Sequence, residues 1–238
     1  MSFAAEQRDR CHHLFQAFYE HPYLRSLADG SASRHSVLHY VGQDHAYLTA
    51  FMRGYGQGIA LSPDRDWVAW FRDQITFLLE DETHPHHVLC AAFDVRYADV
   101  TATRMAPTAQ AYVNHMMQAG RDSLGVLLAA LTPCPWTYIW AAQEQQATAP
   151  VAPDNPFRGW WQFYADAGPL LEEFTERLDR LAERAGPDER ARMERAFEDS
   201  CHLEIRFWQM AWTQETWDHA SAQGRTDATT ATELSPAR

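Results

Sequence analysis

Apolar residues recur at three- and four-residue intervals through most of this chain, the spacing of amphipathic helices. No run alternates apolar and β-branched residues between turn dipeptides, so we expect no β-strand. Ala, Leu, Gln, Glu and Arg are abundant and Val is sparse, which favours helix. The pattern predicts an all-α protein, a single-domain bundle of about eight helices.

Prolines and capping residues set the predicted helix boundaries, with Ser33 as one N-cap. The last helix is expected over 187–219, and the small, polar residues 220–238 are expected to form a disordered tail after a helical domain over 1–219. The other predicted segments are 3–19, 34–60, a helix from Pro63-Asp64 to a break at 81–85, a short helix through Phe93, a helix from Pro107 past Gly120 to 133–135, a linker over 147–156 and a helix over 169–185.

Charge and cysteine usage narrow the classes of function. All 20 basic residues are arginine, so chemistry that needs a lysine amine is excluded, and the net charge of −12 argues against a nucleic-acid partner. The four scattered cysteines fit a reducing compartment. The N-terminus becomes charged too early for a signal peptide, and the apolar stretch 124–136 contains two prolines and is too short for a membrane span. We expect a soluble cytoplasmic protein with no membrane partner.

Two carboxylates fall where apolar residues belong. On the helical wheel, Asp44 lies on the aromatic stripe of the 34–60 helix, and Glu204 lies on the stripe of the last helix. Burying an ionised carboxylate costs several kcal/mol unless a donor or a cation compensates. Either each carboxylate pairs with an arginine, such as Arg53 or Arg206, or both belong to an active site.

Cys134 lies between Pro133 and Pro135, directly after the apolar segment. The two prolines predict a kink at Cys134, with Trp136 and Tyr138 as aromatic walls beside it. A cysteine in such surroundings is either inert packing or, if one of the two carboxylates approaches the thiol, a nucleophile beside a base.

These residues stand within short motifs that resemble the TenA/thiaminase II family, in the same order and over roughly residues 10–215. The motifs are His21-Pro22, Gln43-Asp44-x-x-Tyr47-Leu48-x-x-Phe51-x-Arg53, Pro107-Thr108-x-x-x-Tyr112-x-x-His115-Met116, Leu131-x-Pro133-Cys134-x-Trp136-x-Tyr138 and Glu204-x-x-Phe207-Trp208. The resemblance implies a heme-oxygenase-like helical fold, a homo-oligomer that is commonly a tetramer, and no metal or other cofactor. It also implies a hydrolase of aminopyrimidines related to thiamine, possessing the family's cysteine.

Carried onto this chain, the resemblance implies that Cys134 is the nucleophile that adds to the pyrimidine ring. Glu204 would protonate the ring, and Asp44 would hydrogen-bond the exocyclic amine and help deprotonate the thiol. Ring stacking would come from Tyr47, Phe207 and Trp208, and the polar wall would come from Tyr112, Tyr138 and Tyr164.

Two other functions stay open at this point. One is a metal-dependent oxidase on the same fold, using His84, His86 and His87, or His202 with Glu204. We expect the first three to be ordinary exposed histidines, and a two-residue separation points His202 and Glu204 to different sides of a helix. The other is a pyrimidine-binding or regulatory protein without turnover.

Overall fold

The computed structural model describes residues 2–81 and 83–217, and within them it contains α-helices, one short 3₁₀ helix and no strand. The predicted tail 220–238, and with it the domain boundary at 219, lies outside the described residues. The helices are α1 (Phe3–Arg10), α2 (His12–Tyr19), α3 (Pro22–Asp29), α4 (Arg34–Leu61), α5 (Arg65–Glu80), α6 (Thr83–Ala91), the 3₁₀ helix η1 (Tyr97–Asp99), α7 (Pro107–Ala119), α8 (Leu124–Leu131), α9 (Pro133–Thr148), α10 (Arg158–Ala165), α11 (Gly168–Arg184) and α12 (Pro187–Thr213).

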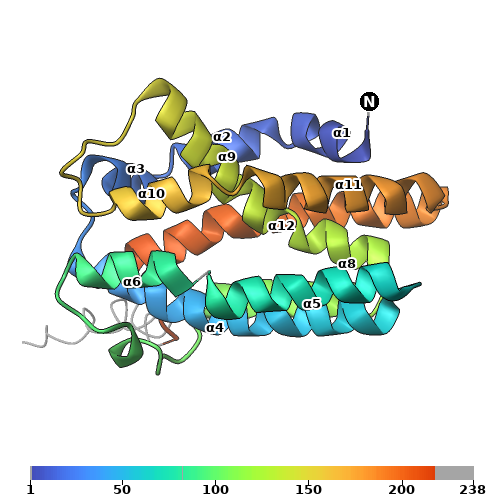
Figure 1. The fold of residues 1–238 in the computed structure, drawn as a ribbon, viewed down its shortest axis with the longest axis horizontal. Helices are drawn as coiled ribbons and strands as arrows, with labels where there is room; N and C mark the ends of the chain where they lie inside the picture. Colours follow the sequence, from blue (N-terminus) through green and yellow to red (C-terminus); the bar gives the residue numbers. More distant parts are fainter. Residues whose placement is uncertain (1, 82, 218–238) are drawn as a thin grey trace, which may run out of the picture.

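Helix α12 is the central element of the bundle. It contacts α1, α2, α3, α4, α7, α8 and α9. Figure 1 shows α4 and α5 side by side along one long edge and α1 and α2 along the opposite edge, with α12 between them. A residue on the inner face of α12 is therefore far from solvent, which is where Glu204 lies.

Capping residues begin the two long helices near the predicted sites. Ser33 Oγ accepts a hydrogen bond from the Ser36 backbone N–H at 3.1 Å at the start of α4, and Asp64 Oδ1 accepts one from Trp67 at the start of α5. Each cap satisfies a helical N–H that has no intrahelical partner. The Ser33 cap is confirmed, and α4 ends where predicted, before Ser62-Pro63.

The bundle has twelve α-helices among its described residues, more than the eight expected, because local chemistry divides several segments. The predicted 3–19 helix breaks at Cys11, which adopts φ −91° and ψ 10°. Likewise, the helix from Pro107 ends at Gly120 rather than continuing past it, and Ser123 caps a new helix, α8. The last helix ends at Thr213 rather than 219, since Gln214 adopts a left-handed φ of 54°.

Helices α3 and α10 were not predicted. Pro22 occupies the first turn of α3, His21 Nδ1 accepts a hydrogen bond from the Tyr23 N–H, and Gly30 closes the helix with φ 79°. Pro22 and Gly30 are ordinary signals for the start and the end of a helix. The helix between them has only eight residues, so its apolar pattern is short. Before α10, the Asn155 side chain donates to the carbonyls of Leu27 and Ala28, so a contact distant in sequence fixes its start.

The prolines around Cys134 shift the helix boundary rather than kink the chain at the cysteine. Helix α8 ends at Leu131, and Pro133 occupies the first turn of α9, where a missing N–H costs nothing. Thr132 between them keeps helical angles, φ −62° and ψ −37°. The prediction of a kink at Cys134 is therefore wrong by two residues.

Helices α8 and α9 follow each other without a break, so Leu124–Thr148 has the length and apolarity of a membrane-spanning helix. The prolines had led us to expect a stretch too short for that. However, 78% of its most apolar window is buried inside the protein. A core helix of a folded domain has the same composition.

Two glycines of α4 provide a matched test of its packing against α5. A Cβ at Gly58 would lie 2.3 Å from Cζ of the buried Phe71 ring, whereas a Cβ at Gly56 would meet nothing within 4 Å. We expect Gly58→Ala to lower the free energy of unfolding by about 1–3 kcal/mol through overpacking. Gly56→Ala should raise it by about 0.5–1 kcal/mol, because alanine favours helix. Urea unfolding of both variants measures this, and equal shifts would contradict the α4–α5 contact.

Candidate active site

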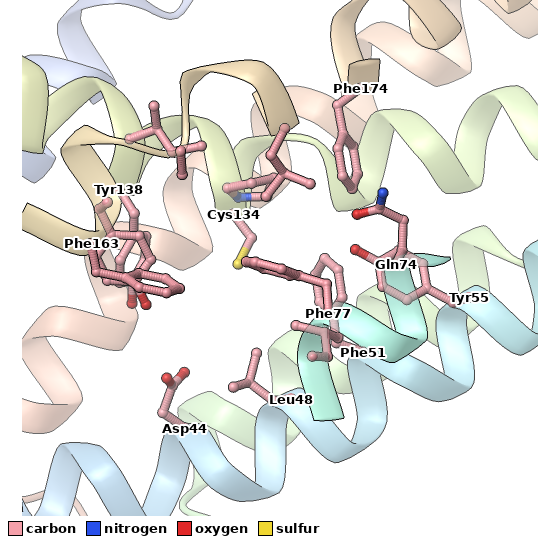
Figure 2. A pocket seen from close by; sticks show the side chains of 16 residues that line it. Asp44, Leu48, Phe51, Tyr55, Gln74, Phe77, Cys134, Tyr138, Phe163 and Phe174 are labelled. Carbon is pink, nitrogen blue, oxygen red and sulfur yellow. The ribbon is translucent and has the colours of Figure 1, made fainter. Parts of the chain in front are cut away.

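A cavity lies between α4, α5, α9, α10 and α11, and Cys134 is in its wall. Its empty space is about 570 Å³, a figure that includes the open mouth. Figure 2 shows Cys134 between two ends of this cavity, with Asp44 and Tyr138 toward one end and Gln74 and Phe174 toward the other. Most of the lining is apolar or aromatic, and the polar exceptions are Asp44, Tyr55, Gln74, Tyr138 and Tyr164.

Asp44 is buried, as predicted, with 5% of its surface exposed. Its Oδ2 accepts a hydrogen bond from the Tyr40 hydroxyl at 3.1 Å and lies 2.7 Å from His86 Nε2. The alternative that it pairs with an arginine is therefore wrong, and Arg53 is exposed. Both partners bind Oδ2, and the carboxylate lies in the wall of the cavity.

A chain of hydrogen bonds supports Asp44 from α6 and η1. The Tyr97 hydroxyl lies 3.2 Å from His86 Nδ1 and 2.7 Å from His45 Nδ1. A carboxylate can only accept, so His86 donates from Nε2 and its Nδ1, in the neutral ring, accepts from Tyr97. His45 then donates to the Tyr97 oxygen, and every group in the chain has a partner. The chain fixes the orientation of the Asp44 carboxylate.

His86 was not predicted as a site residue. It was expected to be exposed with its neighbours, and His84 and His87 are exposed, but His86 is 1% exposed. The missed signal is its position on α6: Pro85 lies within the helix rather than in a break, so Leu89, three residues after His86, shares its buried face.

Glu204 is 2% exposed and accepts a 2.6 Å hydrogen bond from the Tyr112 hydroxyl. It also hydrogen-bonds the Cys134 side chain. The structure thus brings the predicted nucleophile and the second carboxylate into contact, with a phenol on the other side. Arg206, the suggested partner of Glu204, is exposed, so the arginine alternative is wrong here too.

Burial raises the pKa of Glu204 to about 8. The hydrogen bond from Tyr112 opposes the shift, the Asp44 charge adds to it, and the hydrogen bond with Cys134 opposes it. Desolvation dominates because the charged form loses its hydration in the core. At pH 7, which is below this value, most Glu204 side chains carry a proton.

The predicted stacking residues do not line the cavity. The Tyr47 and Phe207 rings contact each other with centroids 5.3 Å apart, and Tyr47 also contacts Tyr112. A flat ring stacked between two others needs them parallel and about 7 Å apart. The Tyr47 and Phe207 rings are tilted by 57°, so stacking on both requires them to separate and to rotate.

Trp208 lies in an aromatic cluster away from the cavity and is fully buried. Its neighbours there are Phe18, Tyr23, Tyr40, Tyr138 and Trp160. Tyr138 belongs both to this cluster and to the cavity wall, and Tyr164 packs on it with centroids 5.0 Å apart. The structure thus places Tyr138 and Tyr164 in the wall and Trp208 behind it.

The histidines suggested for a metal do not gather. No group of three or more His, Cys, Asp or Glu side chains that could hold a metal ion occurs within residues 2–81 and 83–217. His202 is exposed while Glu204 is buried, so the two point to different sides of α12, as expected.

This helical bundle, with a carboxylate-flanked cysteine on its cavity, belongs to a known class. Residues 8–214 match the model of the TENA/THI-4/PQQC family, and the chain is a member of that family. It is 29% identical over 223 residues to an "Aminopyrimidine aminohydrolase" of Halalkalibacterium halodurans, covering 92% of this chain and 99% of that protein. A protein of the same description from Staphylococcus epidermidis is 25% identical over 92% of this chain and 97% of its own length.

Solved structures give the same fold. The TenA homologue from P. horikoshii OT3 superposes with a TM-score of 0.79 at 21% identity, over 90% of this chain and 99% of that one. A Shewanella denitrificans domain of heme oxygenase-like fold gives 0.65 at 11% identity, over 98% and 99%. The predicted all-α, heme-oxygenase-like fold is confirmed.

The raised pKa of Glu204 predicts how stability depends on pH. The folded state holds a proton up to about pH 8 that the unfolded state releases near 4.5. The stabilisation is complete below 4.5 and is lost as pH rises through 8, by at most about 1.4 kcal/mol per pH unit. Glutamine does not ionise, so the Glu204→Gln variant does not lose this stabilisation. The free energy of unfolding of the variant minus that of wild type should therefore rise between pH 5 and 8 and then level off. Thermal unfolding across pH measures the difference.

Glu183→Gln is the control for this experiment, since Glu183 is exposed on α11. Its stability relative to wild type should not change with pH between 5 and 9. A Glu204→Gln difference that is also flat would show that Glu204 ionises at its ordinary pKa.

Proposed function

We propose that this protein hydrolyses aminopyrimidines related to thiamine. The substrate would be 4-amino-5-aminomethyl-2-methylpyrimidine or a close relative, and the product 4-amino-5-hydroxymethyl-2-methylpyrimidine. Membership of the family and similarity to two aminohydrolases over nearly their full lengths support the reaction class. One observation carries the mechanism: the Cys134 thiol at the cavity hydrogen-bonds a buried Glu204 that is mostly protonated at neutral pH.

In the proposed reaction, the Cys134 thiolate forms a C–S bond to the pyrimidine ring while a ring nitrogen takes a proton from Glu204. The ring is then no longer aromatic, so the C–N bond at the 5-methylene breaks, and the amine leaves with the proton that the Cys134 thiol gave up. Water adds its OH to the methylene, its other proton returns to the sulfur as the C–S bond breaks, and the ring nitrogen returns its proton to Glu204. Substrate and water thus give alcohol and amine, and the enzyme returns to its initial state.

Glu204 suits the acid role because its raised pKa keeps a proton available at pH 7, close to the value for efficient transfer. Asp44 suits recognition of the exocyclic amine, because its carboxylate lines the cavity and its Oδ2 is held in place by Tyr40 and His86. The substrate ring would lie in the cavity beside Asp44 and Cys134, and Tyr47 and Phe207 would stack on it only after they separate and rotate. Trp208 would then support Tyr138 rather than touch the substrate.

The nucleophile is tested by Cys134→Ser. We expect turnover of 4-amino-5-aminomethyl-2-methylpyrimidine to fall at least about a thousandfold, since serine lacks the thiolate. Binding of the hydroxymethyl product should change less than about threefold, because the pocket is otherwise intact. Cys90→Ala, at a buried cysteine outside the cavity, should keep activity. A Cys134→Ser enzyme within tenfold of wild type would remove covalent catalysis from the proposal.

The supporting role of His86 is tested separately. His86→Leu removes the 2.7 Å contact to Asp44, so we expect kcat/KM to fall about ten- to a hundredfold, mainly through KM. His86→Gln keeps a donor and should recover most of the loss. His202→Leu, at an exposed histidine, should match wild type. If His86→Leu and His86→Gln have the same kcat/KM, the hydrogen bond to Asp44 does not matter and His86 contributes only by packing.

Two further expectations from the resemblance stay predictions. One is that the protein is a homo-oligomer, commonly a tetramer in the family, and the other is that it is cytoplasmic. Light scattering of the purified protein measures the first.

A further inference from the structure

Gln74 of α5 is a buried polar side chain that has no role in the proposed mechanism. It is 5% exposed, lines the cavity, and its Oε1 accepts no hydrogen bond. A buried amide oxygen without a donor is unfavourable, and such groups in native proteins often await a ligand or a water. A bound molecule with an N–H or O–H group at this point would complete the site.

The position of Gln74 relative to Asp44 indicates which part of a ligand it meets. Figure 2 shows the two at opposite ends of the cavity, with Cys134 between them. If Asp44 holds the pyrimidine amine and Cys134 attacks the ring, the group on the 5-methylene points toward the Gln74 end. This end is walled by Phe51, Phe77, Leu170 and Phe174. Such walls suit a flat or apolar group.

A surface groove adjoins this end of the cavity. It shares Gln74, Phe77 and Leu170 with the cavity. Its charged lining residues are Asp66, Asp73, Glu173, Glu176, Arg177 and Arg180, which leaves a negative excess. Arg177 is already paired with Asp66 at 2.9 Å, between the rings of Trp67 and Trp70. The groove therefore favours neutral or cationic groups over anionic ones.

We propose that the Gln74 end of the cavity is a subsite for the leaving amine, and that this amine carries a flat apolar arm with a hydrogen-bond donor at its outer end. The proposal rests on the proposed function for the orientation of the substrate. It makes Gln74 a specificity-determining residue: Oε1 accepts from the donor on the arm. A primary amine, which leaves as ammonia, is too small to reach it.

The experiment measures binding to the Cys134→Ser protein, so that no probe is consumed. The probes are derivatives of 4-amino-5-aminomethyl-2-methylpyrimidine in which the nitrogen of the 5-aminomethyl group carries a benzyl, a 3-aminobenzyl or a 3-carboxybenzyl arm. Calorimetry should give about five- to tenfold tighter binding for the aminobenzyl arm than for the benzyl arm. The carboxybenzyl arm should bind more weakly than the benzyl arm at low salt, because the groove is acidic.

Three second-site changes in that protein identify the group responsible. Gln74→Leu should reduce the aminobenzyl preference to twofold or less and leave the unsubstituted aminomethylpyrimidine unaffected. Gln74→Glu, which keeps a side-chain oxygen of the same reach, should retain the preference. Gln118→Leu, at an exposed glutamine of α7, should leave it unchanged.

The outcomes separate this inference from the proposed function. Equal affinity for the benzyl and aminobenzyl arms, or a preference that survives Gln74→Leu, overturns the subsite even if the enzyme turns over. A preference that depends on Gln74, in a protein whose native form does not hydrolyse the parent amine, supports the subsite and refutes the hydrolase instead.

Discussion

The burial of Glu204 beside a phenol and a thiol, rather than beside a cation, is the constraint on which the site depends. Helix α12 passes between the other helices and holds this carboxyl away from water. Desolvation then keeps it protonated near neutral pH. An arginine partner would have made the same residue an ionised structural anchor. The position of Glu204 at the centre of the bundle thus leaves it able to hold a proton near neutral pH.

The two carboxylates of the site differ because their partners differ. Asp44 Oδ2 accepts from Tyr40 and lies within hydrogen-bond distance of His86, whereas Glu204 has one phenol and the thiol of Cys134. The first arrangement orients a carboxylate, and the second buries a carboxyl group away from cations. The same division suits a reaction in which an amine is recognised and a ring nitrogen is protonated.

Sequence analysis found much of the site because polar residues on buried helical faces are visible in a periodic pattern. Asp44 and Glu204 stand out in this way, and the prolines around Cys134 mark an unusual turn of helix. His86 and Gln74 did not stand out. His86 lies next to a proline that suggested a break, and no motif or spacing singled out Gln74. Their roles depend on neighbours from α4 and from the cavity, which no local pattern contains.

The sequence by itself determined the helical class, the cap at Ser33, the end of α4 and the burial of both carboxylates, because these depend on local spacing and capping chemistry. Tertiary structure alone decided which partners the carboxylates have, that Tyr47 and Phe207 are in contact, that Trp208 stands behind the wall, and that the cavity has two ends. These features join residues from helices far apart in the chain. Packing sets such contacts, and periodicity within one helix carries no information about its neighbours.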